Sequence, residues 1–300
     1  MTERLSLYGE VTAQIIAELE EGRLPWVQPW DPARCPCTMP HNGLSRRKYS
    51  GINVLILWAA GVGQGFSSQR WLTYRQAEQA GGYVRRGEKG TVICYADRFT
   101  PRNEAEKARS EEREARTVAF LKRFTVFNID QCEGLAPDLV SMSVPRDPVL
   151  AIAEADKLIA ATGADFRIGG DQAFYSPTED YVQVPPQAAF HEPVNWYRTA
   201  LHELGGHWTG HASRLNRDQS GAFGSASYAR EELCAELTSA FACASLGIQP
   251  TVRHCDYIGA WLEVMRADEK AIFRAASAAS KASDFFLAFG GQDGGENGAV

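Results

Sequence analysis

The sequence of 300 residues predicts an α+β protein with two domains, since this length allows each domain a hydrophobic core of its own. Three observations predict this class. Residues 1–132 mix helix-like and strand-like patterns, and residues 133–148 combine Gly, Pro, Asp and Ser without a period, as a linker does. Residues 149–289 begin with a helical pattern, continue with short strand patterns and end in long helical ones. Residues 290–300 are polar and Gly-rich and predict a disordered tail.

Two helices are expected early in the first domain. Residues 7–21 repeat apolar side chains at helical spacing, and Gly22 follows where a helix should stop. Residues 51–60 predict a second, apolar helix. The segment between them, residues 23–50, is rich in Pro, Trp, Arg and Cys, and it predicts a long irregular loop with a functional role.

The remainder of the first domain is expected to hold a short helix and two strands. Thr73 and Gln76 form a capping-box pattern that opens a helix, and a Gly pair closes it. Residues 91–99 and 118–129 are rich in Val, Phe, Tyr and Thr and predict strands. The charged stretch between these strands, residues 102–116, is predicted to be a solvated, mobile loop.

The second domain is predicted to be mainly helical, with three short strands near its start. Gly residues mark the expected ends of several of its helices. The helices are expected at 150–161, 195–210, 228–246 and 257–289, the last broken near 267–268, and the strands at 166–168, 173–175 and 181–184.

Composition excludes some classes of protein. No apolar stretch reaches the roughly 20 residues that span a bilayer, and the first ten residues lack the pattern of a signal peptide, so we expect a cytoplasmic protein without a membrane partner. The seven cysteines are scattered and odd in number, which does not predict a disulfide framework. Most of them are expected to be buried thiols.

The charge is distributed unevenly along the chain. Residues 1–130 hold 19 Lys and Arg against 15 Asp and Glu, a net of +4, whereas residues 131–300 hold 12 against 22, a net of −10. A basic half predicts contact with a polyanion, because Lys and Arg gain affinity by displacing condensed counterions. Ordinary variation of surface charge is the alternative.

The most informative segment is His202-Glu-Leu-Gly-Gly-His207, which resembles the zincin motif H-E-x-x-H with one residue added. In a regular α-helix, side chains five positions apart differ by about 140° around the axis, so the two imidazoles would diverge. A π-bulge absorbs one residue and returns them to one face, and Gly205-Gly206 would permit it.

The longer motif is similar to that of the dipeptidyl peptidase III family, in which a following helix supplies a glutamate from an E-E-C-x-A-E segment. The present sequence has Glu231-Glu-Leu-Cys-Ala-Glu236. That resemblance implies His202, His207 and Glu232 as metal ligands and Glu236 as an acceptor for the outer nitrogen of a ligand histidine. Which of Glu232 and Glu236 is the third ligand is left open, and so is the alternative that these glutamates form a solvated helix face.

Three protein ligands leave a fourth position for water, which is typical of a catalytic zinc site, although Mn²⁺ is also possible. Glu203 would then take a proton from that water, as the base of peptide-bond hydrolysis. His211 is predicted either to support a ligand from outside or to face the substrate, and Tyr228 is a weaker candidate for stabilising an oxyanion. Residues 181–184 precede the motif helix as the edge strand of zincins does, where a peptide can add as a further strand.

The N-terminal half combines aromatic and basic residues as single-strand binding requires, because bases stack on rings while Lys and Arg follow the phosphates. Four of the seven tryptophans fall between Trp26 and Trp71. Burial of Trp58 and Trp71 in the core is the alternative for those two rings. The predicted DNA-binding residues are Trp26, Trp30, Arg46, Arg47, Lys48, Tyr49, Arg70, Trp71, Tyr74, Arg75, Arg85, Arg86 and Lys89.

The whole chain, from about residue 7 to residue 290, resembles the ArdC-type antirestriction proteins of conjugative plasmids, whose N-terminal domain is shared with TraC-type primases. The resemblance is carried by Gly22-Arg-Leu-Pro-Trp26, Tyr49-Ser-Gly-Ile-Asn53, Arg70-Trp-Leu-Thr-Tyr74, Arg86-Gly-Glu-Lys-Gly90, Phe124-Thr-Val-Phe-Asn-Ile-Asp-Gln131 and the blocks from His202 to Arg217 and from Tyr228 to Phe241.

This resemblance implies an N-terminal α+β domain that binds single-stranded DNA and a C-terminal zincin-like, gluzincin metallopeptidase domain. It also implies protection of incoming plasmid DNA, with a protein of the recipient's restriction system as a possible substrate. The lengthened motif departs from the standard H-E-x-x-H, and a DNA-binding protector with a structural, inactive metal site is the alternative. A DNA mimic is disfavoured, because the first 130 residues are basic.

Overall fold

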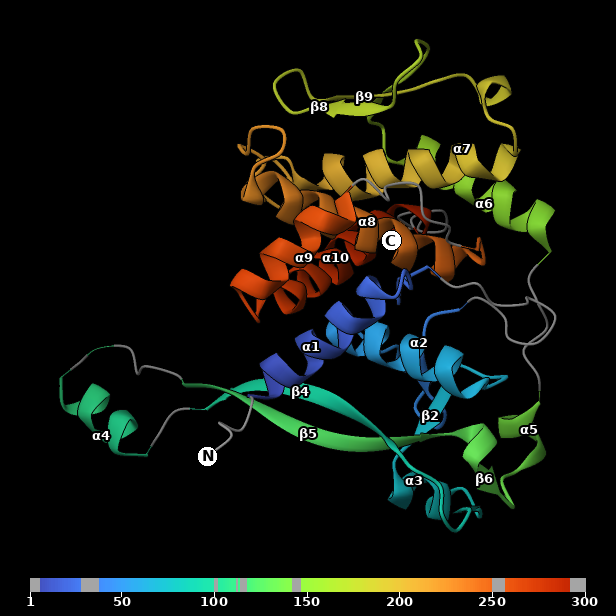
Figure 1. Ribbon diagram of the computed structural model, residues 1–300, viewed down its shortest axis with the longest axis vertical. Helices are drawn as coiled ribbons and strands as arrows, with labels where there is room; N and C mark the ends of the chain where they lie inside the picture. The colour runs from blue at the N-terminus through green and yellow to red at the C-terminus, as the bar shows by residue number, and fades with distance from the viewer. Residues whose placement is uncertain are drawn as a thin grey trace, which may run out of the picture.

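The computed structural model describes residues 6–27, 38–99, 102–111, 113, 118–141, 147–249 and 257–291. The chain forms helices and small sheets in the mixture expected for an α+β protein. Figure 1 shows the N-terminal half below the three C-terminal helices, and the strands β8 and β9 with helices α6 and α7 above them.

The N-terminal half contains five helices and six strands among its described residues. Its helices are α1 (Leu7–Glu20), α2 (Ile52–Gln64), α3 (Tyr74–Gln79), α4 (Arg102–Ser110) and α5 (Pro137–Val140), with a 3₁₀ turn at Ile129–Gln131. Its strands are β1 (His41–Asn42), β2 (Arg70–Leu72), β3 (Tyr83–Val84), β4 (Thr91–Phe99), β5 (Val118–Asn128) and β6 (Cys132–Glu133).

The C-terminal half is dominated by helices. They are α6 (Pro148–Ala161), α7 (Pro193–Ala200), α8 (Ala226–Leu246), α9 (Ile258–Ala267) and α10 (Ala271–Leu287), with a π-helix at Leu201–His207 and 3₁₀ turns at Gln187–Ala189, Trp208–Gly210 and Ala288–Gly291. The strands are β7 (Asp165–Ile168), β8 (Phe174–Ser176) and β9 (Tyr181–Val184).

The strands form three small sheets. One has the order β1-β2-β5-β4 and is extended by the long antiparallel hairpin of β4 and β5, which runs from the Thr91–Val126 pair to the Phe99–Val118 pair. A second sheet pairs β3 with β6. The third has the order β7-β9-β8, with β7 parallel and β8 antiparallel to the central strand β9.

A hydrophobic core joins the two halves of the chain. Side chains of α1 and α2 pack in one buried cluster with side chains of α8, α9 and α10. Trp26 meets Trp261 edge to face with ring centroids 5.7 Å apart, and Trp58 meets Phe241 at the same distance. The opposite face of α8 belongs to a second cluster with α6, β9 and α7. Because α8 contributes to both clusters, it is the central helix of the fold.

Most elements begin and end close to where the sequence predicts them, but two expectations need correction. Residues 102–116 were expected to form a loop, yet residues 102–110 form α4, with Glu104 in the first turn and Lys107 and Arg109 in the last, where each charge complements the helix dipole. The predicted linker 133–148 contains α5, whose Leu139 is buried; residues 142–146, like residues 292–300 of the predicted tail, lie outside the described part. Within the described residues, no helix combines the length and apolarity of a bilayer span.

Candidate metal centre

The segment that carries both histidines is a π-helix, as the sequence predicts. It spans Leu201–His207, directly after the regular helix α7. The wider turn brings the His202 and His207 rings to the same side, with centroids 5.0 Å apart. The extra residue of the motif is therefore absorbed by the backbone, and the two imidazoles face a common point.

Gly206 allows this π-helix to lie directly against α8. A Cβ atom at position 206 would stand 2.7 Å from the Cβ of Ala235 and 2.8 Å from its Cα, closer than carbon atoms approach. The neighbouring Gly205 is less restricted, because a Cβ there would meet the ring of Phe286 at 3.5 Å, which is ordinary contact. The sequence needs a glycine at 206 so that the two helices approach closely.

His202, His207 and Glu232 converge from the π-helix and from α8. The Nε2 atom of His202 lies 3.6 Å from Oε2 of Glu232, and the Nε2 atom of His207 lies 3.5 Å from Oε1 of the same carboxylate. One ligand atom from each of the three residues falls within 4.8 Å of the others. All three side chains are at least 86% buried, since their exposed fractions are 5%, 14% and 7%.

This arrangement fits a divalent cation. Ligands that lie 2.0–2.2 Å from a tetrahedral ion are separated from one another by about 3.3–3.6 Å, which matches the two nitrogen–oxygen distances. Two imidazoles and one carboxylate are also the donor set of catalytic zinc sites. The three residues therefore have the composition and the spacing to hold Zn²⁺ or a similar ion.

The charges of the group also favour a cation between its members. Burial opposes a positive charge on His202, but the nearby carboxylates of Glu232 and Glu236 outweigh it and raise the pKa of His202 to about 10. Burial likewise opposes the Glu232 carboxylate, yet His202 and His207 together lower the pKa of Glu232 well below its usual value. Buried carboxylates that hold a proton on an imidazole provide the negative field that a metal ion would occupy.

Further carboxylates lie behind the imidazoles. Oε2 of Glu236 is 3.5 Å from the Nδ1 atom of His202, which is the outer nitrogen, and Oε1 of Glu231 is 3.9 Å from Nδ1 of His207. An acceptor beside the outer nitrogen fixes the orientation and tautomer of a ligand histidine, and of these two carboxylates only Glu236 comes close to hydrogen-bond distance. This contact of Glu236 is the one that the sequence predicts; the contact of Glu231 is one that the sequence reasoning missed.

The Glu231 carboxylate is itself fixed by two residues of the loop before α8. Arg217 donates to Oε1 of Glu231 at 2.7 Å and to the carbonyl of Gly206, and Gln219 donates to the carbonyl of His207 at 2.7 Å. These bonds tie the loop to the end of the π-helix. Long polar side chains in a loop have no pattern that predicts such a role, so neither residue could be identified from the sequence.

Three other predicted residues lie on the elements that carry this group or directly after them. Glu203 lies on the π-helix between the two histidines and is 8% exposed. Tyr228 is one turn before Glu232 on α8, and burial followed by hydrogen bonds with Tyr257 and Glu232 raises its pKa. His211 is not part of the group of potential ligands among the described residues: its Nδ1 is 2.8 Å from Ser213 Oγ. His211 is therefore not a ligand within the described residues, and its role in supporting a ligand histidine or facing a substrate stays a prediction.

The strand predicted at the edge of a sheet lies at its centre. Residues 181–184 form β9, as expected, but β9 is the central strand of its sheet, paired with β7 on one side and β8 on the other. Its backbone hydrogen bonds are used within the sheet, so it cannot accept a peptide as an added strand. Three strands in one short segment give no sequence signal for their order, which is the reason for the error.

Three of the predicted DNA-binding residues are buried. Trp26 and Trp71 are each 0% exposed, and their rings pack against Trp261 and Phe66. Arg70 is 7% exposed and donates to the carbonyls of Asp138 and Leu139. The prediction that these three residues contact DNA is wrong, because their rings and guanidinium group are used inside the protein. Trp58 is buried, as expected for a core residue.

The other predicted DNA-binding residues in the described part lie at the surface or near it. Tyr74 is 52% exposed, whereas Tyr49 is half-buried. The basic members of this group are Arg46, Arg47, Lys48, Arg75, Arg86 and Lys89, which are exposed, and Arg85, which pairs with Glu88. Trp30 lies outside the described residues.

The hairpin of β4 and β5 carries exposed aromatic residues that the sequence reasoning missed. Tyr95 is 50% exposed and Phe124 is 46% exposed, and their rings meet edge to face with centroids 5.8 Å apart. The alternating pattern of a strand does not show which face is open to solvent. This aromatic pair could therefore be identified only from the structure.

The chain is similar to known proteins in both of its halves. Residues 6–127 match the family model of the N-terminal domain of anti-restriction factor ArdC, and residues 153–278 match that of a zincin-like metallopeptidase. The uncharacterized protein y4eC of Sinorhizobium fredii is 40% identical over 290 residues, covering 94% of this chain and 92% of that protein. A DNA primase TraC of Escherichia coli is 39% identical over 300 residues, but the chain spans only 27% of that primase.

Two solved structures are similar over nearly their whole length. The metal-free structure of the antirestriction protein ArdC from plasmid R388 has a TM-score of 0.79 and 38% identity, with 96% of this chain and 98% of that chain covered. The Mn(II)-bound structure of the same protein has a TM-score of 0.79 and 36% identity, with 97% and 100% covered. Identity and coverage of this extent indicate a common family rather than a shared fold alone.

Proposed function

This chain belongs to the ArdC family of antirestriction proteins and has a zincin-like second half, and from this membership we propose that it protects incoming plasmid DNA by two activities. Its N-terminal half binds single-stranded DNA without sequence preference in the cytoplasm of the recipient cell. Its C-terminal half holds a divalent metal ion and hydrolyses a peptide bond in a protein of the restriction system. The observation that carries the second activity is the convergence of His202, His207 and Glu232 at 3.5–3.6 Å.

His202, His207 and Glu232 would hold the metal, with Glu236 orienting the first imidazole. Zn²⁺ suits this donor set, and Mn²⁺ is supported by the Mn(II)-bound structure of the relative from R388. When bound, such an ion lowers the pKa of a coordinated water and polarises a carbonyl oxygen. The three side chains supply three ligand positions and leave one for water or substrate.

Glu203 is proposed as the base that takes the proton of the attacking water and passes it to the leaving amine. It lies on the same π-helix as both histidines, which supports its access to the metal. The Tyr228 hydroxyl, one turn before Glu232 and kept protonated by burial, would donate to the oxyanion that forms during attack.

One observation favours the alternative that the metal has only a structural role. Counted over the whole residue, His202, Glu203 and Glu232 are 4%, 8% and 5% exposed, and a peptide needs an open path to the metal. Under this alternative the ion would tie the π-helix to α8, and protection would depend on DNA binding alone. Glu203→Gln separates the two functions, because it keeps the shape of the side chain and removes the base.

The test is conjugation of a plasmid into a restricting recipient, with protection supplied by the wild-type protein or by Glu203→Gln. Peptide-bond hydrolysis predicts that the variant still binds metal and single-stranded DNA but no longer protects. Protection equal to that of the wild type would assign the metal a structural role. A non-restricting recipient controls for effects on conjugation itself.

DNA binding by the N-terminal half is supported by exposed basic residues in a turn that joins β1 to the segment before α2. Arg46 has a positive φ of 60°, and Arg47 and Lys48 follow it with exposed side chains. An oligonucleotide titrated at several salt concentrations should bind with a steep dependence on salt, since each phosphate contact releases counterions. Arg46→Ala and Trp30→Ala should weaken binding more than Trp58→Ala, which should instead reduce stability. Affinity that does not vary with salt would contradict this electrostatic account.

A further inference from the structure

We propose that the cleft between the two halves of the chain is a binding site for single-stranded DNA, so that helix α10 of the zincin-like half shares in holding the strand. The proposal rests on the proposed function, because it assumes that the chain binds single-stranded DNA. It goes further in assigning part of the DNA path to a half that carries a net charge of −10 from residue 131 onward.

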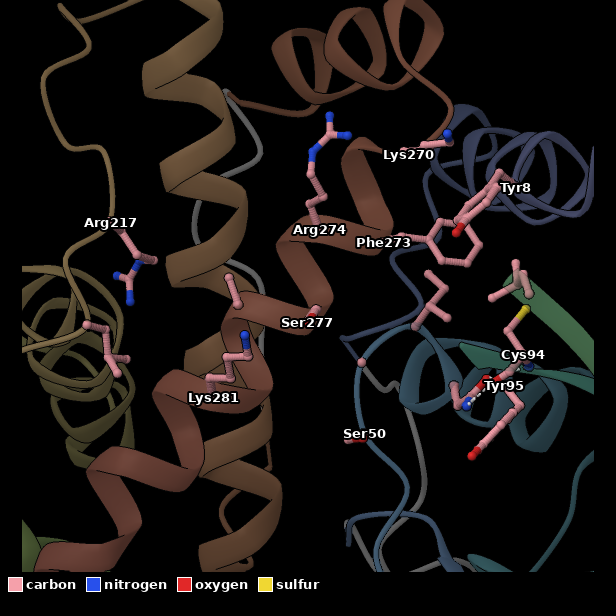
Figure 2. Close-up of a pocket in the computed structure, with 16 residues that line it drawn as sticks. Tyr8, Ser50, Cys94, Tyr95, Arg217, Lys270, Phe273, Arg274, Ser277 and Lys281 are labelled. Atoms are coloured by element: carbon pink, nitrogen blue, oxygen red, sulfur yellow. Dashed lines mark hydrogen bonds between the residues drawn. The ribbon is translucent and has the colours of Figure 1, made fainter. Parts of the chain in front are cut away.

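The cleft has a volume of about 860 Å³, in the upper part of the range of ligand sites. Helix α10 and its N-cap contribute Lys270, Phe273, Arg274, Ser277 and Lys281 to the lining, and Figure 2 shows Phe273 beside Tyr8 of the N-terminal half. The facing side includes α1, the start of α2 and the hairpin strands β4 and β5. Its residues come from both family segments, which explains why neither half alone predicts the cleft.

The charge of the cleft has one sign. Four of its lining residues are basic, and none of the described residues that line it is a carboxylate. Arg217 is used by Glu231, and Arg274 pairs with Asp268 at the rim, whereas Lys270 and Lys281 are exposed on α10. A cleft lined by one sign of charge concentrates ligands of the opposite charge.

Three of the basic residues that line the cleft follow one face of α10. Lys270, Arg274, Ser277 and Lys281 are spaced by four, three and four residues, which places them in a row along the helix. A row of this kind matches the repeated phosphates of an extended strand.

Aromatic rings lie beside the basic residues. This combination favours a nucleic acid over an acidic peptide as the ligand. Tyr8 and Phe273 meet edge to face at 4.7 Å across the two halves, and the Nζ atom of Lys270 lies 5.1 Å from the centre of the Tyr8 ring. Tyr95 also lines the cleft and is half exposed, and its contact with Phe124 continues the aromatic surface onto the hairpin. Aromatic rings beside a row of basic residues can stack the nucleotide bases, while Lys and Arg pair with the phosphates.

The start of α2 adds backbone donors to the same opening. Ser50, Gly51, Ile52 and Asn53 line the cleft, and the N-cap Gly51 of this 13-residue helix donates its N–H to Ser280 Oγ of α10 at 2.8 Å. The first turn of a helix favours negative charge. Together with the basic residues of α10, this first turn would bind a phosphate between the two halves.

The experiment measures binding of a fluorescent 30-nucleotide oligo-dT to the full-length protein over a range of NaCl concentrations. The test variant carries Lys270→Ala, Arg274→Ala and Lys281→Ala. The matched control carries Lys157→Ala, Arg167→Ala and Arg266→Ala, which replace three exposed basic residues outside the lining of the cleft. Three lost phosphate contacts should reduce the slope of log affinity against log salt by about 2 and lower affinity on the order of 100-fold at 0.1 M salt. The control should retain the wild-type slope.

Other results would overturn the proposal in distinguishable ways. If wild-type, test and control proteins bind the oligonucleotide with the same slope, the cleft is not part of the DNA path, although the proposed function stands. If the wild type binds no oligonucleotide, both the proposed function and this inference fail. If poly-glutamate of equal charge displaces the oligonucleotide as well as unlabelled oligo-dT does, and Tyr95→Ser binds as tightly as the wild type, the cleft is a site for an acidic peptide.

Discussion

Substitution of Gly206 by Ala should disrupt the metal centre without touching any ligand. The added Cβ would stand 2.7 Å from the Cβ of Ala235 and 3.1 Å from its carbonyl oxygen, whereas non-bonded carbons prefer about 3.5–4.0 Å. The π-helix and α8 would therefore have to separate by about 1 Å. Glu232 lies one turn from Ala235 on α8, so the separation would act directly on the distances between the carboxylate and the imidazoles.

The size of the effect follows from these distances. The nitrogen–oxygen distances of 3.5 and 3.6 Å would grow to about 4.5 Å, beyond the roughly 4.4 Å that two ligands can span on one ion even when they lie opposite each other. Metal affinity should fall by at least about 100-fold, the upper end of the effect of losing an outer partner of a ligand. Overpacking should cost about 1–3 kcal/mol of unfolding free energy, offset by roughly 1 kcal/mol from replacing a helical glycine.

Gly205→Ala is the matched control, because the same methyl group would meet Phe286 at an ordinary 3.5 Å. Zinc affinity is measured by competition with a chromophoric chelator, and stability by urea unfolding of the metal-free proteins. We expect Gly205→Ala to keep zinc affinity and to gain up to about 1 kcal/mol of stability. Equal zinc affinities for the two variants would refute the reasoning, because the close approach of π-helix and α8 would then have no part in forming the site.

Three further predictions concern single side chains. Glu236→Gln should weaken zinc binding by about 10–100-fold, since it removes the charged acceptor beside His202, and chelator competition should show no change if Glu236 is only a core carboxylate. Trp26→Ala should lower the free energy of unfolding in urea by about 3–5 kcal/mol, because the ring is fully buried. An unchanged unfolding midpoint together with weaker DNA binding would instead show that Trp26 contacts DNA. Burial raises the pKa of Cys243 from 9.0 to about 12, so unfolding favours thiolate formation and stability falls as pH rises from about 9 towards 12. Cys243→Ala should flatten that fall by up to about 1.4 kcal/mol per pH unit, and parallel profiles for the two proteins would show that the thiol is not protected.

The fold was predictable where a local pattern decides the structure. The capping box at Thr73 and Gln76 forms as expected, and the long C-terminal helix breaks between α9 and α10 at the predicted place. The helix α4 was missed because a charge-rich segment without an apolar face has no periodic signal, even though its terminal charges favour a helix. The order of β7, β9 and β8 depends on pairing between strands, which no local pattern records.

The site was predictable as far as spacing and helix geometry reach. The number of residues between His202 and His207 requires a π-turn if both rings are to face one ion, and the structure has that turn. The positions of Arg217 and Gln219 depend on how a loop folds back onto the π-helix, so the sequence could not give them. Burial was the main source of error in the N-terminal half, because an aromatic residue such as Trp26 fits a core and a DNA surface equally well by composition.

X-ray absorption at the zinc edge of the zinc-loaded protein tests the central claim most directly, because it counts and identifies the atoms bound to the ion. We predict two imidazole nitrogens at about 2.0–2.1 Å, a carboxylate oxygen in the same shell and no sulfur, with one imidazole lost in His207→Ala. A sulfur shell at about 2.3 Å, or a spectrum that His207→Ala leaves unchanged, would show that the ion binds elsewhere in the chain.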